Sequence, residues 1–342
     1  MDAKEKILGQ LFHERLQVEP EWSIDTHNGF RWWPDKHAQT VEVTTAESAL
    51  SGETVARIAI RTDLVRLHDI GERQLTAVNL LMQLASLCGI VYDPATRTLS
   101  LASAIETSEE ETSWTVPLIG LAALIQTGEA RVLGPALART LGEREAISGP
   151  PDRGIREEPS EITKLMEIEI AATGHEPSRW SPAEFLEVGS QYLDKPPALL
   201  ANYDRSGFTV EFPYGDESSL CEVRSDTSHP RYGNGLFVLQ TFPVGGSIHP
   251  QGEKLALAMN ETELARSPFG LGGYTWRDGL LHFTAFFPNV AFMPGLLSTV
   301  YFACAFRARA IAQRILGQDW GPDSFSVDHT ALWRLLSEAG DD

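Results

Sequence analysis

Apolar residues follow two spacings along this chain, one typical of helices and one typical of strands. Near the N-terminus, Leu8, Leu11, Phe12 and Leu16 recur at every third or fourth position, which predicts a helix over residues 3–16 with one apolar side. Such a side is stable only when another surface covers it. We therefore expect this helix to pack on another element of the fold.

Three short strands are predicted after this helix. In the third, Ile58 and Ile60 face one side while Arg57 and Arg61 face the other, an alternation typical of a strand with one buried face. Together they predict a meander with one face toward solvent. The strands cover residues 30–33, 40–44 and 54–64.

The first half continues with a helix, a hairpin and a second helix. Helical spacing returns over residues 72–88, and Gly89 is expected to cap the end of that helix. A hairpin is predicted over residues 91–105. Pro117 suits the first turn of a helix, where its missing N–H costs nothing, and this helix is expected to run to about Leu141.

The second half repeats the same order of elements. A helix is predicted to begin at Pro182, because Ser181 and Glu184 have the spacing of a capping box. In a later hairpin, Asp278 and Gly279 tolerate the positive φ of a tight hairpin turn. Spacing places the other elements as strands over 207–212, 219–224 and 235–242, and as helices over 160–172, 252–265 and from Pro294 onward.

This repetition predicts an α+β protein of two tandem α-β-β-β-α-β-β-α units, each an antiparallel sheet with helices packed on one face. Two helix ends also agree, since ALARTLG at 136–142 and IAQRILG at 311–317 share arginine, leucine and glycine in the same columns. The predicted boundaries are a first unit at 1–142, a linker rich in proline, glycine and charge at 143–160, a second unit at 161–317 and a C-terminal helical tail at 318–342.

This order of elements resembles the fold of the class I type III secretion chaperones, which YbjN-like bacterial proteins share. The element boundaries carry the resemblance, among them Leu8 to Leu16, Val41 to Leu64 and Pro117 to Leu141 in the first half, and Phe208 to Phe242 and Pro294 to Leu316 in the second. The resemblance implies a bacterial, non-enzymatic protein that holds a segment of another protein. Those chaperones usually pair as homodimers of short chains, so two joined copies imply a monomeric pseudo-dimer, with a homodimer as the other arrangement.

The chain is acidic, with 47 Asp and Glu residues against 28 Lys and Arg residues and a formal net charge of −19. Its summed field repels phosphate backbones and anionic lipid headgroups. We therefore expect neither nucleic acid nor a membrane surface as a partner. Residues 279–306 lack Asp, Glu, Lys and Arg, but Pro288 and Pro294 interrupt them and their first part alternates like a strand, which argues against a membrane span.

Cysteine and histidine spacing gives no sign of a metal or a disulfide framework. Cys88, Cys221 and Cys304 form no CxxC pair, and no two histidines form HxxxH or HExxH. We expect no metal and no cofactor. Residues 1–16 mix charges with apolar positions, unlike a signal peptide, so we expect a cytoplasmic protein.

The densest polar cluster is SDTSHPRYGNG at 225–235, which contains Asp226, His229 and Arg231. These three residues could form a ligand or anion site, or do acid–base work. The plainer interpretation is a polar loop between two strands, in which Pro230 and the glycines serve the turn. We favour the loop, because a catalytic site also needs partners that the sequence does not identify.

Adjacent aromatic residues raise a separate question. Neighbours in a strand point to opposite faces, so only one of Trp32 and Trp33, and one of Phe286 and Phe287, can enter the same core. Either the other half of the chain covers the second face, or a partner protein does. The positions predicted to contact a partner are Trp32, Trp33, Phe212, Tyr214, Phe286 and Phe287.

The sequence therefore predicts a chaperone-like or adaptor-like module that binds a segment of a partner protein and performs no chemistry. The chain of 342 residues is long enough for two units of ordinary size. One alternative is an enzyme or small-ligand-binding protein with a pocket between the two units. A second alternative is a structural subunit of a larger assembly.

Overall fold

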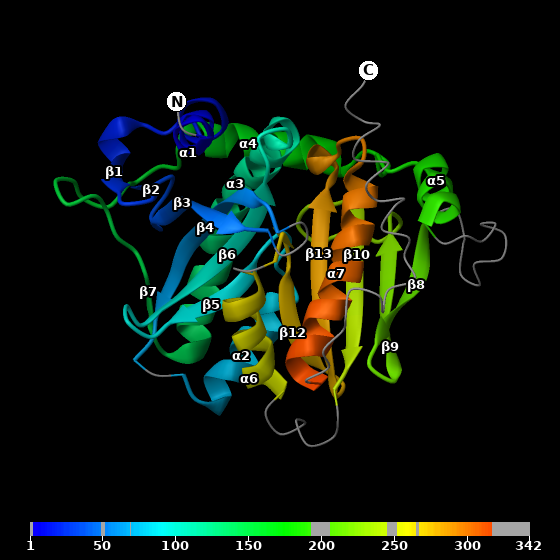
Figure 1. Ribbon diagram of the computed structural model, residues 1–342. Helices are drawn as coiled ribbons and strands as arrows, with labels where there is room; N and C mark the ends of the chain where they lie inside the picture. The colour runs from blue at the N-terminus through cyan, green and yellow to red at the C-terminus, as the bar shows by residue number, and fades with distance from the viewer. Residues whose placement is uncertain are drawn as a thin grey trace.

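The computed structural model describes residues 3–48, 52–68, 70–192, 206–244, 252–264 and 267–316. They form helices and two antiparallel sheets that lie beside each other (Figure 1). The prediction of an α+β fold is therefore confirmed. The predicted helical tail at 318–342 lies outside the described residues.

The first sheet has eight strands. Seven come from the first half of the chain and are β1 (Ser23–Thr26), β2 (Gly29–Trp32), β3 (Gln39–Glu47), β4 (Thr54–Arg66), β5 (Gly89–Asp93), β6 (Thr98–Thr107) and β7 (Arg144–Glu145). Across the sheet they run β1-β2-β3-β4-β6, with β5 paired to β6 and β7 to β4. The predicted alternation is present in β4, where Ile58 and Ile60 are fully buried and Arg61 is exposed.

One long helix covers the inner face of this sheet. The helical elements of the first half are α1 (Ala3–Gly9), the π-helical turn η1 (Gln10–Arg15), the 3₁₀ turn η2 (Pro20–Trp22), α2 (Glu72–Met82) and α3 (Thr112–Leu141). α3 packs on β4 and β6, and η1 contacts its flank. Among the described helices, α3 is the one long and apolar enough to cross a membrane, but 83% of its apolar window is buried inside the protein. It is the core helix of the first half.

The second sheet has five strands. Its strands are β8 (Gly207–Tyr214), β9 (Glu217–Arg224), β10 (Gly235–Pro243), β12 (Gly273–Arg277) and β13 (Leu280–Pro288). They follow the order β8-β9-β10-β13-β12, and the strands that correspond in chain order in the first sheet follow β2-β3-β4-β6-β5. In the β12–β13 turn, Asp278 and Gly279 have φ values of 52° and 82°, as predicted.

The helical elements of the second half lie around its sheet, and α7 covers one face. They are α4 (Glu161–Gly174), α5 (Pro182–Tyr192), α6 (Gly252–Met259) with the π-helical turn η5 (Asn260–Leu264), the 3₁₀ turn η6 (Asn289–Ala291) and α7 (Leu296–Leu316). The predicted capping box of α5 is present, since the Glu184 N–H donates to Ser181 Oγ at 3.4 Å and the Ser181 N–H donates to Glu184 Oε2 at 2.9 Å. In Figure 1, α7 lies across the face of β10 and β13.

Two predicted boundaries are wrong. α2 ends at Met82, and Gly89 is the first residue of β5 and no helix cap. After Met82 the backbone N–H groups of residues 83–85 make only i→i−3 turn bonds, and at Ser86 the backbone bonds to other elements, as where the Phe286 N–H donates to the Ser86 carbonyl oxygen at 3.1 Å. α3 begins at Thr112, so Pro117 lies beyond its first turn.

The predicted linker at 143–160 follows the first sheet closely. It contains β7, and its Ser148 N–H donates to the Lys36 carbonyl oxygen at 3.0 Å. Arg156 is 7% exposed and pairs with Glu19, to whose Oε1 its Nη2 donates at 2.8 Å. The segment is thus a covering strap on the first half.

The two sheets meet at corresponding strands and helices. α2 contacts α6, and β5 contacts β12. Gly89 of β5 and Gly273 of β12 lie so close that a Cβ atom on Gly273 would stand 2.9 Å from the Gly89 Cα. Glycine is needed here because any side chain would separate the two backbones.

Two asparagine side chains bond to the edge of β12 that faces away from β13. Asn79 on α2 donates to the Trp276 carbonyl oxygen at 2.7 Å and accepts from the Trp276 N–H at 2.6 Å. Asn260 on η5 donates to the Tyr274 carbonyl oxygen at 3.1 Å and accepts from the Tyr274 N–H at 2.7 Å. Each amide therefore provides the donor and acceptor that a neighbouring strand would offer.

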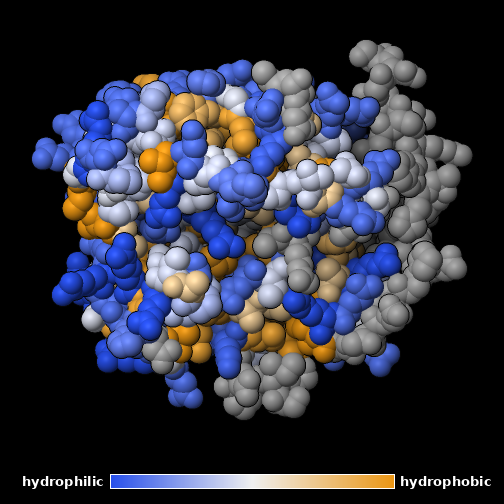
Figure 2. All heavy atoms as spheres, turned by 60° about the vertical axis from the view of Figure 1, so that its left-hand side comes forward, coloured by the Kyte–Doolittle hydropathy of each residue, from blue (hydrophilic) through white to orange (hydrophobic). Residues whose placement is uncertain are grey.

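Charged pairs lie on the face of the first sheet away from α3. Arg31 Nη2 lies 2.6 Å from Asp63 Oδ2, and Arg57 pairs with Glu106. Figure 2, which turns the edge strands of the first sheet forward, shows hydrophilic side chains over most of that side, with apolar ones in small groups. This agrees with the predicted solvent-facing side of the meander.

Replacing Asn79 with alanine is expected to lower the free energy of unfolding by about 1–3 kcal/mol, because the Trp276 N–H and carbonyl lose their partners. Arg73→Ala, at an exposed position of the same helix, is the control and should change it by less than about 0.5 kcal/mol. Urea-induced unfolding measures both. Equal effects of the two substitutions would contradict the role assigned to Asn79.

Candidate functional site

The loop between β9 and β10, residues 225–234, packs on the C-terminal end of α4. Gly233 has a φ of +69°, and a Cβ atom there would stand 2.2 Å from the Gly174 carbonyl oxygen. The Asn234 N–H donates to the same carbonyl oxygen at 2.9 Å. This close approach holds the loop, including Tyr232, against the C-terminal end of α4.

A buried carboxylate on α3 connects the two halves. Glu129 is 1% exposed. Its Oε1 accepts hydrogen bonds from the Ser86 N–H at 2.8 Å and from the Tyr232 hydroxyl at 3.1 Å. Its Oε2 accepts from the Cys88 thiol at 2.9 Å. One side chain therefore joins the core helix, the segment after α2 and the loop of the second half.

Burial raises the pKa of Glu129, because the charged carboxylate loses its hydration there. The hydrogen bonds from Cys88, Ser86 and Tyr232, and the positive charge of Arg231, act in the opposite direction. Burial also raises the pKa values of the Cys88 thiol and the Tyr232 hydroxyl. Both groups therefore keep the protons that they donate to Glu129.

His229 is held in one neutral tautomer. Its Nδ1 accepts from the backbone N–H of Arg231 at 3.1 Å and of Tyr232 at 3.3 Å. The proton therefore belongs on Nε2, which lies 3.3 Å from the Leu84 carbonyl oxygen in the first half. Burial lowers the pKa of His229 to about 4, and the charge of Arg231 contributes to the shift.

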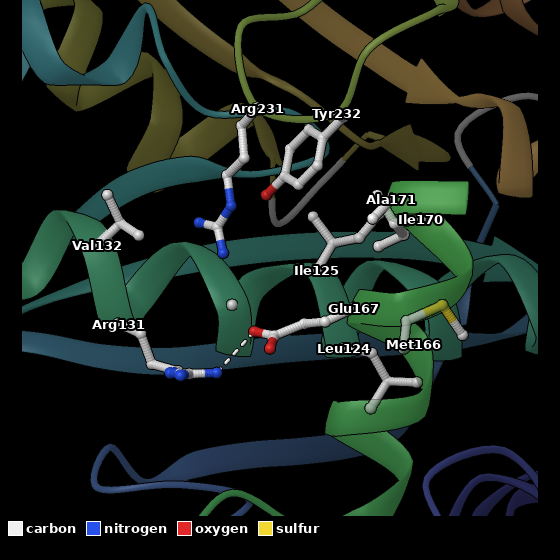
Figure 3. Close-up of a pocket in the computed structure, with 11 residues that line it drawn as sticks. Leu124, Ile125, Arg131, Val132, Met166, Glu167, Ile170, Ala171, Arg231 and Tyr232 are labelled. Atoms are coloured by element: carbon white, nitrogen blue, oxygen red, sulfur yellow. Dashed lines mark hydrogen bonds and ion pairs between the residues drawn. The ribbon is translucent and has the colours of Figure 1, made fainter. Parts of the chain in front are cut away.

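A pocket of about 400 Å³ opens beside this network, between α3, α4 and the β9–β10 loop. Figure 3 shows the two helices forming its walls, with Arg231 and Tyr232 reaching in from the loop. Most of the lining is apolar. The lining residues are Leu124, Ile125, Gly128, Arg131 and Val132 on α3, Met166, Glu167, Ile170 and Ala171 on α4, and Arg231 and Tyr232.

The two arginines of the pocket differ in their partners. Arg131 Nη1 donates to Glu167 Oε1 at 2.7 Å, and Arg131 Nε lies 3.2 Å from Asp35 Oδ2. Within the described part of the chain, the Arg231 guanidinium has no carboxylate at ion-pair distance, and it contacts the Tyr232 ring, whose centroid lies 5.4 Å away. Arg231 is therefore the cation left for a ligand.

Chemically, this arrangement suits binding. The neutral imidazole of His229 uses both nitrogens in hydrogen bonds, and Glu129 is enclosed by three donors. No three His, Cys, Asp or Glu side chains gather into a group that could hold a metal ion in the part of the chain that the structure covers. An apolar cavity whose wall holds one arginine, Arg231, without a carboxylate partner among the described residues can bind an apolar group that carries a negative charge.

The predicted ligand cluster is divided in the structure. His229 and Arg231 lie at the junction, but Asp226 is bound elsewhere, since Arg224 Nη2 donates to Asp226 Oδ2 at 2.6 Å and Ser206 Oγ at 3.1 Å. The hydrogen bond from Arg224 lowers the pKa of Asp226. The Asp226 carboxylate therefore forms an exposed ion pair with Arg224.

The six aromatic residues predicted to contact a partner are buried, and that prediction is corrected. Chain segments from elsewhere cover the second faces, as where Trp33 Nε1 donates to Ser148 Oγ of the strap at 3.0 Å and where Phe286 lies against Ser86 of the first half. The exposed fractions of Trp32, Trp33, Phe212, Tyr214, Phe286 and Phe287 are 0%, 3%, 3%, 1%, 2% and 1%.

Comparison with known proteins adds no relative. No family model matches the chain, and no curated protein and no solved structure resembles it significantly. Any functional inference therefore rests on the geometry of the site.

Sequence reasoning missed Glu129 and the pocket residues of α4. A signal for Glu129 was present, because it is the one acidic residue between Thr112 and Leu141, a stretch that is otherwise strongly apolar. A lone carboxylate in a buried helix needs partners from other elements. No comparable signal marked Glu167.

The pKa of Glu129 predicts a dependence of stability on pH. A carboxyl whose pKa is raised on folding binds more protons in the folded state, so the free energy of unfolding falls as pH rises from about 4.5, the ordinary pKa of Glu. Glu129→Gln should remove this fall, so that its free energy of unfolding stays level where that of the wild type declines toward pH 8. Urea unfolding between pH 4.5 and 8 measures it, with the exposed Glu169→Gln as control. Parallel profiles for wild type and Glu129→Gln would contradict the assignment.

His229 predicts a loss of stability in acid. Its folded pKa of about 4 lies below the ordinary value of 6.5, so the unfolded chain takes up a proton that the folded chain excludes, and stability is lost as pH falls from 6.5 toward 4. His229→Gln should reduce this loss by about 1–2 kcal/mol, allowing for partial exposure. The control is His13→Gln on an exposed position. An unchanged slope in His229→Gln would count against the buried neutral tautomer.

Proposed function

We propose that this chain is a binding protein that holds an apolar segment of another polypeptide against α4 and the adjoining pocket, without a chemical step of its own. One observation carries the proposal, which is that the two helices forming the walls of an apolar cavity also carry exposed apolar side chains. Leu165 and Ile168 on α4 are 57% and 66% exposed, and Val132 on the pocket wall is 55% exposed. Exposed apolar surface beyond single scattered side chains is typical of interaction sites.

Ion pairs hold this surface in place. Lys164 Nζ lies 2.9 Å from Glu158 Oε2 and 3.1 Å from Glu161 Oε1 at the start of α4, where Ser160 caps the helix. Arg131 joins α4 to α3 through Glu167. A helix that is capped at its start and joined to α3 at its middle presents its apolar residues with little ordering cost on binding, which favours affinity.

The repeated strand order supports an internal duplication, in which two units related to the class I secretion chaperones form a pseudo-dimer within one chain. Corresponding elements meet at the junction, α2 with α6 and β5 with β12, which is the contact pattern of a two-fold pair. The boundaries proposed are 1–142 and 161–317, joined by the strap at 143–160. The compact α+β fold is compatible with a soluble protein, and we place it in the bacterial cytoplasm.

A small-molecule ligand is the second candidate for the same pocket. Its support is the position of the cavity between elements of the two halves, with Arg231 facing it. The exposed Leu165 and Ile168 favour a polypeptide, since a ligand inside the cavity leaves them uncovered.

A double substitution tests the binding surface. When the wild-type protein is purified from its native host, a stoichiometric protein partner should co-purify. The double variant Leu165→Glu, Ile168→Glu should retain at least tenfold less of that partner, because its added charges face the apolar segment. Glutamate is a good helix former, so α4 should stay folded. Leu186→Glu on the distant α5, at a position that is 41% exposed, is the matched control.

A photo-reactive residue at Val132 provides an independent measurement. It should form an adduct with the same partner, and the adduct should disappear in the double variant. Retention of the partner by the double variant, or purification of the wild type without any stoichiometric protein, would refute the proposed function.

A further inference from the structure

We infer that the pocket binds the C-terminal residue of the partner polypeptide, with an apolar side chain between α3 and α4 and the terminal carboxylate on Arg231. This inference rests on the proposed function and adds the chemistry that the pocket selects. It draws on the Arg231 guanidinium, which has no carboxylate partner among the described residues, on the ion-paired Arg131 beside it, on the apolar lining and on the exposed residues outside the pocket.

The sequence makes room for Arg231 on the surface of α3. A Cβ atom at Gly128 would stand 3.0 Å from Arg231 Nη2 and 3.6 Å from Glu167 Oε1. Glycine inside a helix costs about 1 kcal/mol relative to alanine, and here it lets the guanidinium lie against the helix. In Figure 3 the Arg231 side chain extends from the loop toward α3 and the space beside Glu167.

The charge of the lining selects an anion with one negative group. Arg131 is engaged with Asp35 and Glu167, which leaves Arg231 as the cation without a carboxylate partner among the described residues. One guanidinium matches the two oxygens of a carboxylate in a bidentate pair. A phosphate group would bring a second charge, for which the described lining holds only Arg131, already paired with Glu167 and Asp35.

The remaining lining selects an apolar body. Leu124, Ile125, Met166 and Ile170 form most of the wall that the ligand would contact. A volume of about 400 Å³ lies in the lower part of the range of small-ligand pockets. This space suits a single large apolar side chain with its attached backbone.

A chain terminus satisfies both requirements with one residue. The last residue of a polypeptide carries a carboxylate and a side chain on the same Cα atom. The residues before it would leave the pocket past Val132 and Ala171 and continue around α4 over Ile168, which is one helical turn from Ala171, toward Leu165. An internal segment would bring the apolar group but no carboxylate at this place.

Peptides that differ only at the C-terminus test this directly. The probes are fluorescein-labelled nine-residue peptides with mixed interior sequences that end in Leu, Ile, Val, Phe or Met, each made as the free acid and as the amide. Fluorescence anisotropy measures their binding to the full chain, and unlabelled decanoate serves as a competitor. Free acids should bind about 10- to 100-fold more tightly than the matching amides, because the amide loses a charge-assisted hydrogen bond.

Two variants of the protein connect this preference to the pocket. Arg231→Gln should bind acids and amides alike, at the level of the amides. Arg139→Gln, an exposed arginine on α3 outside the pocket, should keep the wild-type preference. Ala171→Leu, which fills the pocket from an exposed helical position, should weaken all peptides at least tenfold.

The outcomes separate this inference from the proposed function. Equal binding of acids and amides by the wild type would overturn the carboxylate assignment and leave polypeptide binding at α4 standing. Binding of decanoate that depends on Arg231, without binding of any peptide, would overturn both in favour of a free amphipathic acid. Absence of binding by every probe would also overturn both.

Discussion

The arrangement of the molecule depends on how two edge strands are closed where the halves meet. An edge strand offers unpaired N–H and C=O groups that attract other chains. In β12 these groups are bound by the side-chain amides of Asn79 and Asn260, one from each half. In return, the Tyr92 N–H of β5 donates to Glu261 of η5 at 3.2 Å. The bonds of Asn79 and Tyr92 join α2 and β5 to the second half, whose loop residue Tyr232 reaches Glu129 on α3 beside the pocket.

Much of the fold could be predicted from local spacing because most elements bury one side only. The alternation in β4, the capping box of α5 and the positive φ at Asp278 and Gly279 all depend on neighbours in sequence. The errors arise where distant residues intervene. Residues 83–88 keep helical spacing but bond to β13 and the β9–β10 loop. The short strands β7 and β11 (Phe269–Gly270) form only where they pair with the longer strands β4 and β6.

The site was less predictable, since its members come from three separate segments. His229 and Arg231 stood out as a polar cluster, and the structure places both at the junction. Their neighbours could not be read from the chain, because nothing in sequence connects Glu129 to the loop 100 residues later. The adjacent aromatic residues indicated that something must cover the second face of each strand. For Trp33 this is the strap at 143–160, which the sequence predicted to be a linker.

The short strand β11 (Phe269–Gly270) belongs to the second half in sequence and to the first sheet in space. It pairs with β6 beside β5, the Glu106 N–H donates to the Pro268 carbonyl oxygen at 2.8 Å, and the buried Arg307 of α7 donates to the Phe269 carbonyl oxygen at 3.3 Å. A gene divided at the strap would therefore leave one product with an incomplete sheet and the other with a strand that has nothing to join. The two products would be fragments that complement each other, and the native chain would unfold as a single cooperative unit.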